Sequence, residues 1–245
     1  MRALYYNKLQ DYSAITMDHE DSNFPVENIF STFLTAYTKT TTDHTKITVT
    51  FTSDQSMDCF FLGFSSMALT STIVCVYKNA GGATIFTDNL VKASWYIVKS
   101  YFTELTTIRS IEITITNADA VVFYIGTMWA GSRIDLPDFQ SKPASGYGDL
   151  APCDETLTGQ VSGQIRGLRN KWEIVFSYIE TDTILETLKT YVNAIGQMPH
   201  FIDFYESVAD KSFYAHIKNE NTGWIPQNDT RFKHRDIKLI YRECL

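Results

Sequence analysis

The chain has 245 residues, of which 44% are hydrophobic, 14% aromatic and 20% charged. This composition supplies apolar material for two packed cores and excludes an intrinsically disordered chain. The longest apolar runs, such as residues 120–125, are too short to cross a bilayer, so we expect no membrane partner. Residues 1–159 hold 10 basic and 17 acidic residues, which accounts for the whole net charge of −7. Such an acidic half repels phosphate backbones and argues against duplex nucleic acid as a partner.

The four cysteines are scattered without the close ligand pairs of a metal site, and we expect neither a metal nor another cofactor. Cys59 and Cys75 lie in apolar, strand-like runs, which predicts two small buried hydrophobes, with a disulfide between them as the alternative. The N-terminal residues lack the apolar core and cleavage site of a signal peptide. We therefore expect synthesis in a cytoplasm.

Alternating apolar and polar residues predict β-strands in the first half of the chain. In residues 45–52, Ile47, Val49 and Phe51 point to one side, as a half-buried strand requires. Thr48, Thr50 and Thr52 point to the other side. Residues 111–116 repeat this period. Less strictly alternating runs at 58–62, 71–77 and 121–129 also predict strands. Turn-rich segments at 78–82 and 116–119 separate them. Together these segments predict a β-sandwich over residues 1–132.

Residues 133–160 are rich in proline and glycine and have little periodicity, which predicts a long linker. The segment is either a tether or an arm that lies across a neighbouring subunit. The candidate arm residues are Arg133, Pro137, Pro143 and Pro152.

Residues 161–245 contain one strong helix pattern. Thr183 and Glu186 have the spacing of a capping box, and Gly196 followed by Pro199 marks the helix end. The apolar residues between them form one stripe: Ile184, Leu185, Leu188, Tyr191, Val192 and Ile195. Strands are expected near 161–166, 171–179, 200–205, 212–218 and 235–243. The fold class is therefore mainly β, a sandwich followed by an α+β module with one helix on a mostly antiparallel sheet.

Several short motifs resemble known families. Residues 23–29 (NFPVENI), followed by 46–51 (KITVTF) and 61–64 (FLGF), resemble the galactose-binding-like (discoidin-like) jelly rolls of tailed-phage virion proteins. In those domains a Pro-x-x-Asn-Leu/Ile turn precedes the first long strand, and the domain closes on segments similar to 124–129 (YIGTMW) and 133–136 (RIDL). Related jelly rolls often carry an Asp beside the Ser-Thr after the turn, whereas this chain has Phe30 before Ser31-Thr32. This difference argues against the expectation that the chain shares the calcium-stabilised or sugar-binding loop of those domains.

The C-terminal half resembles phage tail and baseplate proteins of the tail-tube or distal-tail type. The matching pieces are Trp172-x-x-x-Phe176, the helix, residues 199–203 (PHFID) and a last strand that ends near Glu243. Both resemblances imply a virion structural protein that forms a ring or occupies a tail, baseplate or neck interface.

No residue set predicts a catalytic site. The five histidines are spread singly, and there is neither a Gly-x-Ser-x-Gly elbow nor a glycine-rich phosphate loop; residues 80–83 (AGGA) predict a hairpin turn instead. Residues 18–21 (DHED) form the densest acidic cluster and offer oxygens to Ca²⁺, but they lack the glycine turn of a calcium loop. A solvated acidic loop is the favoured interpretation.

The basic residues Arg231, Lys233 and Arg235 are the strongest candidates for contact with an acidic neighbour, because interleaved acidic residues argue against nucleic acid. Trp129 and Trp172 lie in strand patterns and are expected in a core. Trp95 and Trp224 flank loop-like segments and are candidate interface residues, with sugar stacking as the alternative.

The sequence therefore favours a non-enzymatic structural component of a phage virion, made in the host cytoplasm. Its partners would be other copies of itself and neighbouring tail proteins. The alternatives are a carbohydrate-binding module that aids adsorption to a host glycan, and a glycan-processing enzyme whose paired carboxylates come from distant positions.

Overall fold

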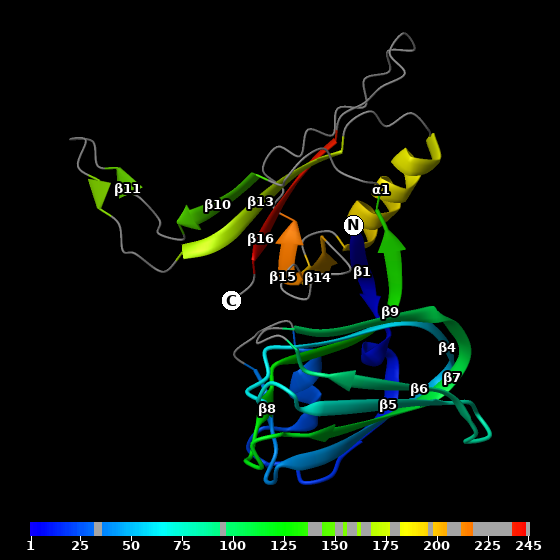
Figure 1. The fold of residues 1–245 in the computed structure, drawn as a ribbon. Helices are drawn as coiled ribbons and strands as arrows, with labels where there is room; N and C mark the ends of the chain where they lie inside the picture. Colours follow the sequence, from blue (N-terminus) through cyan, green and yellow to red (C-terminus); the bar gives the residue numbers. More distant parts are fainter. Residues whose placement is uncertain are drawn as a thin grey trace. The chain divides into compact units, whose positions relative to one another are not determined.

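The computed structural model describes residues 1–31, 36–93, 97–136, 144–149, 154–155, 161–162, 168–176, 182–195, 198–204, 212–217 and 237–243. In these residues the chain is mainly β, with antiparallel strand pairs and one α-helix (Figure 1). The chain divides into two compact units. We call residues 2–135 with 201–213 the sandwich unit, and Met1 with residues 136–200 and 214–245 the helix unit. No helix in the described segments combines the length and hydropathy that a bilayer crossing needs.

The sandwich unit begins with nine strands and two short 3-10 helices. The strands are β1 (Arg2–Asn7), β2 (Tyr12–Met17), β3 (Thr38–Lys39), β4 (His44–Gly63), β5 (Thr72–Lys78), β6 (Thr84–Val91), β7 (Ile97–Thr116), β8 (Tyr124–Ile125) and β9 (Thr127–Asp135). The 3-10 helices are η1 (Lys8–Asp11) and η2 (Val26–Phe30).

The two long strands β4 and β7 bend at their middle. The first half of β4 pairs with the second half of β7 and with β2, while its second half pairs with the first half of β7 and with β9. The register shifts three times between Thr50 and Cys59, and Thr107 of β7 has a φ of 66°, so the extended backbone is interrupted on both strands. Bulges of this kind let one continuous sheet fold over into the two layers of a sandwich.

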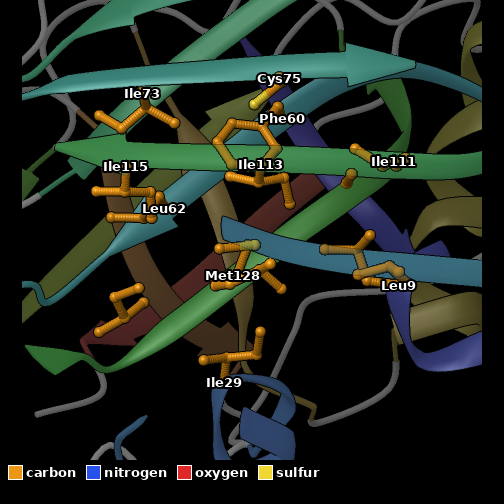
Figure 2. Packing of buried hydrophobic residues seen from close by; sticks show 14 of the residues in the cluster. Leu9, Ile29, Phe60, Leu62, Ile73, Cys75, Ile111, Ile113, Ile115 and Met128 are labelled. Carbon is orange, nitrogen blue, oxygen red and sulfur yellow. The ribbon is translucent and has the colours of Figure 1, made fainter. Parts of the chain in front are cut away.

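The core lies between these two layers. Ile47, Val49 and Phe51 are buried, which confirms the alternation expected for residues 45–52. Figure 2 shows residues of both layers in contact around this core: Phe60, Leu62 and Met128 from one layer, and Cys75, Ile111, Ile113 and Ile115 from the other. Each fully buried aliphatic side chain stabilises the fold by about 1.5 to 3 kcal/mol relative to exposure.

Cys59 and Cys75 are free and buried, so they are the small hydrophobes expected and not a disulfide. Burial raises the pKa of both thiols well above its ordinary value, which keeps them protonated. The thiol of Cys59 donates to the carbonyl of Gly131 at 3.0 Å.

The expected hairpin turn joins β5 to β6. The side chain of Asn79 accepts hydrogen bonds from the backbone of Gly81 and Ala83, both at 3.0 Å. Gly82 has a φ of 78°, which an L side chain rarely adopts. The structure thus confirms a turn at 80–83.

A distant segment completes the sandwich unit. Ile202 and Asp203 of β14 (His200–Asp203) pair with β1. The ring of Phe201 lies 4.9 Å from the ring of Phe61 and 5.9 Å from that of Trp129, centroid to centroid. Trp129 is buried, as expected. A Cβ atom at Gly63 would approach the Phe201 ring to 3.2 Å, so glycine allows this ring to pack on the sheet.

The helix unit combines α1 (Asp182–Ile195) with an antiparallel sheet. Its strands are β10 (Ala144–Asp149), β13 (Leu168–Phe176), β16 (Ile237–Glu243) and most of β15 (Ser212–Ile217), and the two short strands β11 (Asp154–Glu155) and β12 (Val161–Ser162) pair separately. Trp172 is buried, as expected.

The helix lies where the sequence predicts it. Leu185, Leu188, Tyr191 and Ile195 are buried, which confirms the apolar stripe, and Val192 is half-buried. The helix spans Asp182–Ile195, and the capping box of Thr183 and Glu186 stays a prediction, because the side chain of Thr183 lies outside the described residues.

The predicted domain limits of 1–132, 133–160 and 161–245 stay predictions. Within the segment predicted as an arm, residues 144–149 pair with β13 along the whole of β10. Within the segment predicted as the C-terminal module, residues 201–213 belong to the sandwich unit.

Candidate functional site

The bend in β4 and β7 brings their four ends to one end of the sandwich. His44 pairs with Thr116, and Gly63 pairs with Ile97, at opposite ends of the two strands. The connecting loops are therefore gathered together, on the side where β8 lies in Figure 1. We call this region the loop end and define it as residues 18–24, 37–44, 64–71 and 117–124.

Backbone hydrogen bonds tie these loops to one another. Thr41 N donates to His19 O at 2.8 Å, and Thr40 N donates to Phe123 O at 2.9 Å. Ser66 N donates to the carbonyl of Tyr124 at 3.1 Å. The loops thus form one connected surface on a rigid sheet, the usual place for a binding site.

Three aromatic rings meet at the loop end. The rings of Phe24 and Tyr37 are stacked, with centroids 4.9 Å apart and planes inclined by 14°. Tyr37 also contacts Tyr124, with centroids 5.2 Å apart. Tyr124 is 45% exposed and the other two are half-buried. We call these three residues the aromatic surface.

The Pro-x-x-Asn motif explains why these rings come together. Pro25 precedes η2, whose first N–H, on Val26, donates to the Glu20 carboxylate at 2.6 Å. The side chain of Asn28 then donates to the carbonyl of Tyr37 at 3.0 Å. This bond fixes Tyr37 next to the segment that carries Phe24. The pairing of β3 with β8 brings Tyr124 beside them.

Polar groups flank the aromatic surface. The Lys39 ammonium lies 3.4 Å from the Asp21 carboxylate and 5.6 Å from the centre of the Phe24 ring. The backbone N–H of Asn23 and the nearby Lys39 hold the pKa of Asp21 below its ordinary value, so it stays an acceptor in mild acid. A donor and an acceptor that are both half-buried thus stand beside the aromatic surface.

Exposed apolar side chains lie in the segment that leads to Tyr124. Val121 and Val122 precede Tyr124 and are 54% and 49% exposed. The buried side chain of Asn117 donates to the carbonyl of Val121 at 2.9 Å and holds this turn in place. Exposed apolar groups next to polar ones are typical of ligand-binding surfaces.

The acidic cluster at residues 18–21 is part of this region. Glu20 and Asp21 accept hydrogen bonds from the loop backbone, which indicates a role in holding the loop. In the described segments, no three His, Cys, Asp or Glu side chains are arranged to hold a metal ion. The sequence did not predict that the rings of His19 and His44 touch, with centroids 4.9 Å apart.

Most of the site residues predicted from the sequence lie outside the described segments: Trp95, Pro137, Pro143, Pro152, Trp224, Arg231, Lys233 and Arg235. Arg133 is described and lies in β9, where its guanidinium is 3.7 Å from Asp58 and 5.5 Å from the centre of the Tyr101 ring. The interface and arm roles of these residues stay predictions.

The sequence patterns did not predict Phe24, Tyr37 and Tyr124 as site residues. The motif around Pro25 was visible, but the pattern of a single segment gives no sign that rings from three segments meet. Tyr124 was assigned to a strand, where one exposed tyrosine has no special meaning.

No family model matches the chain, and no curated protein matches it. The chain is similar to a pectin-binding carbohydrate-binding module, with 15% identity over 49% of this chain and 91% of that one, at a TM-score of 0.41. It is also similar to chitosan-binding module 1 of a chitosanase/glucanase from Paenibacillus sp. IK-5, with 13% identity over 52% and 99% of the two chains and a TM-score of 0.43.

A third similar structure is a fucose-binding module of Streptococcus pneumoniae, with 14% identity over 51% of this chain and 94% of that one, and a TM-score of 0.43. About half of this chain is therefore similar to whole modules of this kind, at identities and TM-scores that assign the chain to no family.

Proposed function

We propose that the sandwich unit binds a carbohydrate at the aromatic surface. The observation that carries the proposal is the cluster of the half-buried Phe24 and Tyr37 with the exposed Tyr124, beside the Lys39–Asp21 pair. A pyranose ring has an apolar C–H face and a rim of hydroxyl groups. The C–H face packs on an aromatic ring, and the hydroxyl groups need both a donor and an acceptor. The proposal depends on this surface and not on the low structural similarities.

We propose binding without turnover. Glycoside hydrolysis needs one carboxyl group that donates a proton and another that faces the sugar. At the aromatic surface, Glu20 and Asp21 accept backbone hydrogen bonds instead. A carboxylate held in this way is suited to fixing a loop or accepting a sugar hydroxyl.

Binding is tested with the purified full chain on a glycan microarray, followed by calorimetric titration of the glycans that bind. We expect Tyr124→Ala to weaken binding about tenfold, or about 1.4 kcal/mol, because the exposed ring is lost while the backbone of β8 keeps its pairing. Tyr6→Ala is a matched control, because Tyr6 is 44% exposed and lies in β1 opposite Ser132, away from the loop end.

Equal binding by the wild type and Tyr124→Ala would place the sugar elsewhere on the chain. If no glycan binds the wild type, the carbohydrate proposal is wrong.

A location in a phage virion stays a hypothesis, and it is compatible with sugar binding, because a virion protein can attach its particle to a host glycan. The basic residues expected to mediate subunit contacts lie outside the described segments. Mass spectrometry of purified virions tests this hypothesis directly, and absence of the protein would contradict it.

A further inference from the structure

We infer that the aromatic surface selects its glycan by charge, accepting amino sugars with free protonated amines and rejecting uronic acid and sulfated sugars. This inference rests on the proposed function and names the class of ligand. It follows from the charged groups that the fold brings to the loop end.

The loop end is strongly acidic. It carries five carboxylates and one half-buried lysine, which leave a formal charge of −4: Asp18, Glu20, Asp21, Asp43 and Asp119 against Lys39. These residues come from three loops that the backbone hydrogen bonds described above hold together. Their fields therefore act on the same bound ligand.

Neither Lys39 nor Lys92, which is hydrogen-bonded to the loop end, is available to an anionic sugar. Lys39 is paired with Asp21. Lys92, which follows β6, is buried, and its ammonium donates to the carbonyls of Ser65 and Met67. An anionic sugar on the aromatic surface would thus meet several carboxylates and no unpaired ammonium among the described residues of the loop end.

The expected size of the effect follows from Coulomb's law. One carboxylate about 7 to 10 Å from an amine in water changes affinity about two- to threefold. Several carboxylates around one sugar therefore produce a preference of about tenfold or more for an amine over a neutral group at low salt. The same field disfavours a uronate by a similar factor.

The test compares three oligosaccharide probes of equal length by calorimetric titration of the full chain. The probes are the hexamers of glucosamine, N-acetylglucosamine and galacturonic acid, which are cationic, neutral and anionic. We expect the glucosamine hexamer to bind best and the galacturonic acid hexamer not to bind. The preference should disappear between about 0.01 M and about 1 M salt, as the Debye length falls from about 30 to about 3 Å.

Two variants separate local from general electrostatics. Asp119→Asn removes a charge at the loop end and should weaken binding of the glucosamine hexamer about two- to threefold. Glu104→Gln removes the same charge from the exposed middle of β7, near the bend. That position is about 20 Å along the strand from the loop end, which is beyond the Debye length at about 0.1 M salt. The Glu104→Gln variant should therefore bind the glucosamine hexamer as the wild type does.

The outcomes distinguish this inference from the proposed function. If the neutral or anionic hexamer binds as well as the cationic one, and Tyr124→Ala abolishes that binding, the surface binds sugar but charge selection is wrong. If Glu104→Gln weakens binding as much as Asp119→Asn, the effect comes from net charge and the inference is again wrong. If none of the hexamers and no arrayed glycan binds, both proposals fail.

Discussion

At the scale of single residues, the helix unit contains a chain of hydrogen bonds that joins His200, Tyr191 and Tyr241. In neutral His200, the Nδ1–H donates to Met198 O at 3.0 Å, which leaves Nε2 to accept from the Tyr191 hydroxyl at 2.6 Å. Tyr191 then accepts from the hydroxyl of Tyr241 at 3.1 Å. The three side chains are buried, so each bond replaces one that water would otherwise make.

This chain predicts a loss of stability in acid. Burial lowers the pKa of His200 to about 4, and the imidazole of His216 acts in the same direction. As the pH falls below about 6.5, His200 is protonated in the unfolded chain but still neutral in the folded one. The free energy of unfolding therefore decreases between that pH and about 4. We expect a loss of about 2 kcal/mol between pH 7 and pH 4.5 from this residue.

Urea unfolding of the wild type and of His200→Gln at both pH values measures this effect. The variant has no group that titrates at this position, so its stability should change less with pH. An equal pH dependence of the two proteins would show that other groups cause the acid sensitivity.

At the scale of elements, α1 shows how a periodic pattern becomes packing. Leu188 is fully buried, while Glu186, two residues earlier, is exposed and pairs with Lys189 at 2.6 Å. The contact between the hydroxyls of Tyr191 and Tyr241 fixes the same face of the helix against β16. One side of α1 therefore provides its tertiary contacts.

Leu188→Ala should destabilise the helix unit by about 2 to 5 kcal/mol, because the removed side chain leaves a cavity under the helix. Glu186→Ala is the control on the opposite face, and it should change stability by less than about 0.5 kcal/mol. Chemical denaturation of both variants checks the prediction. A loss of less than about 0.5 kcal/mol in Leu188→Ala would show that this face is not packed.

At the scale of the whole molecule, Asp203 connects parts of the sandwich unit that are far apart in sequence. Its buried carboxylate accepts from the Lys99 ammonium and from the Tyr101 hydroxyl, both at 2.8 Å. The pKa of Tyr101 is raised by burial and by the charge of Asp203, so its hydroxyl stays protonated and can donate. Asp203 is thus bound to β7 through its side chain, while Ile202 and Asp203 pair with β1.

Removing this carboxylate should therefore be costly. Asp203→Ala leaves the half-buried Lys99 without this charge partner, and we expect a loss of about 3 to 5 kcal/mol. The double variant Asp203→Ala with Lys99→Met removes both charges and should recover part of that loss. Urea unfolding of the two variants, of Lys99→Met and of the wild type completes the cycle. Additive effects in this cycle would mean that the pair is not coupled.

Local patterns determined much of this fold from the sequence alone. Alternation identified the buried face of residues 45–52 and 111–116, helical spacing identified the stripe of α1, and Ala-Gly-Gly-Ala at 80–83 identified the hairpin turn. These properties depend on residues that are neighbours along the chain, because the period of an element fixes which side chains share a face.

The tertiary structure alone decided the candidate site. The register shifts that bend β4 and β7 have no periodic signal, yet they bring the loops to one end. The Pro-x-x-Asn motif marked the position of a turn, but not that it would hold Tyr37 against Phe24 and Tyr124. The physical reason is that periodicity shows which face of a segment is buried or exposed, while strand register and loop closure decide which distant residues that face will meet.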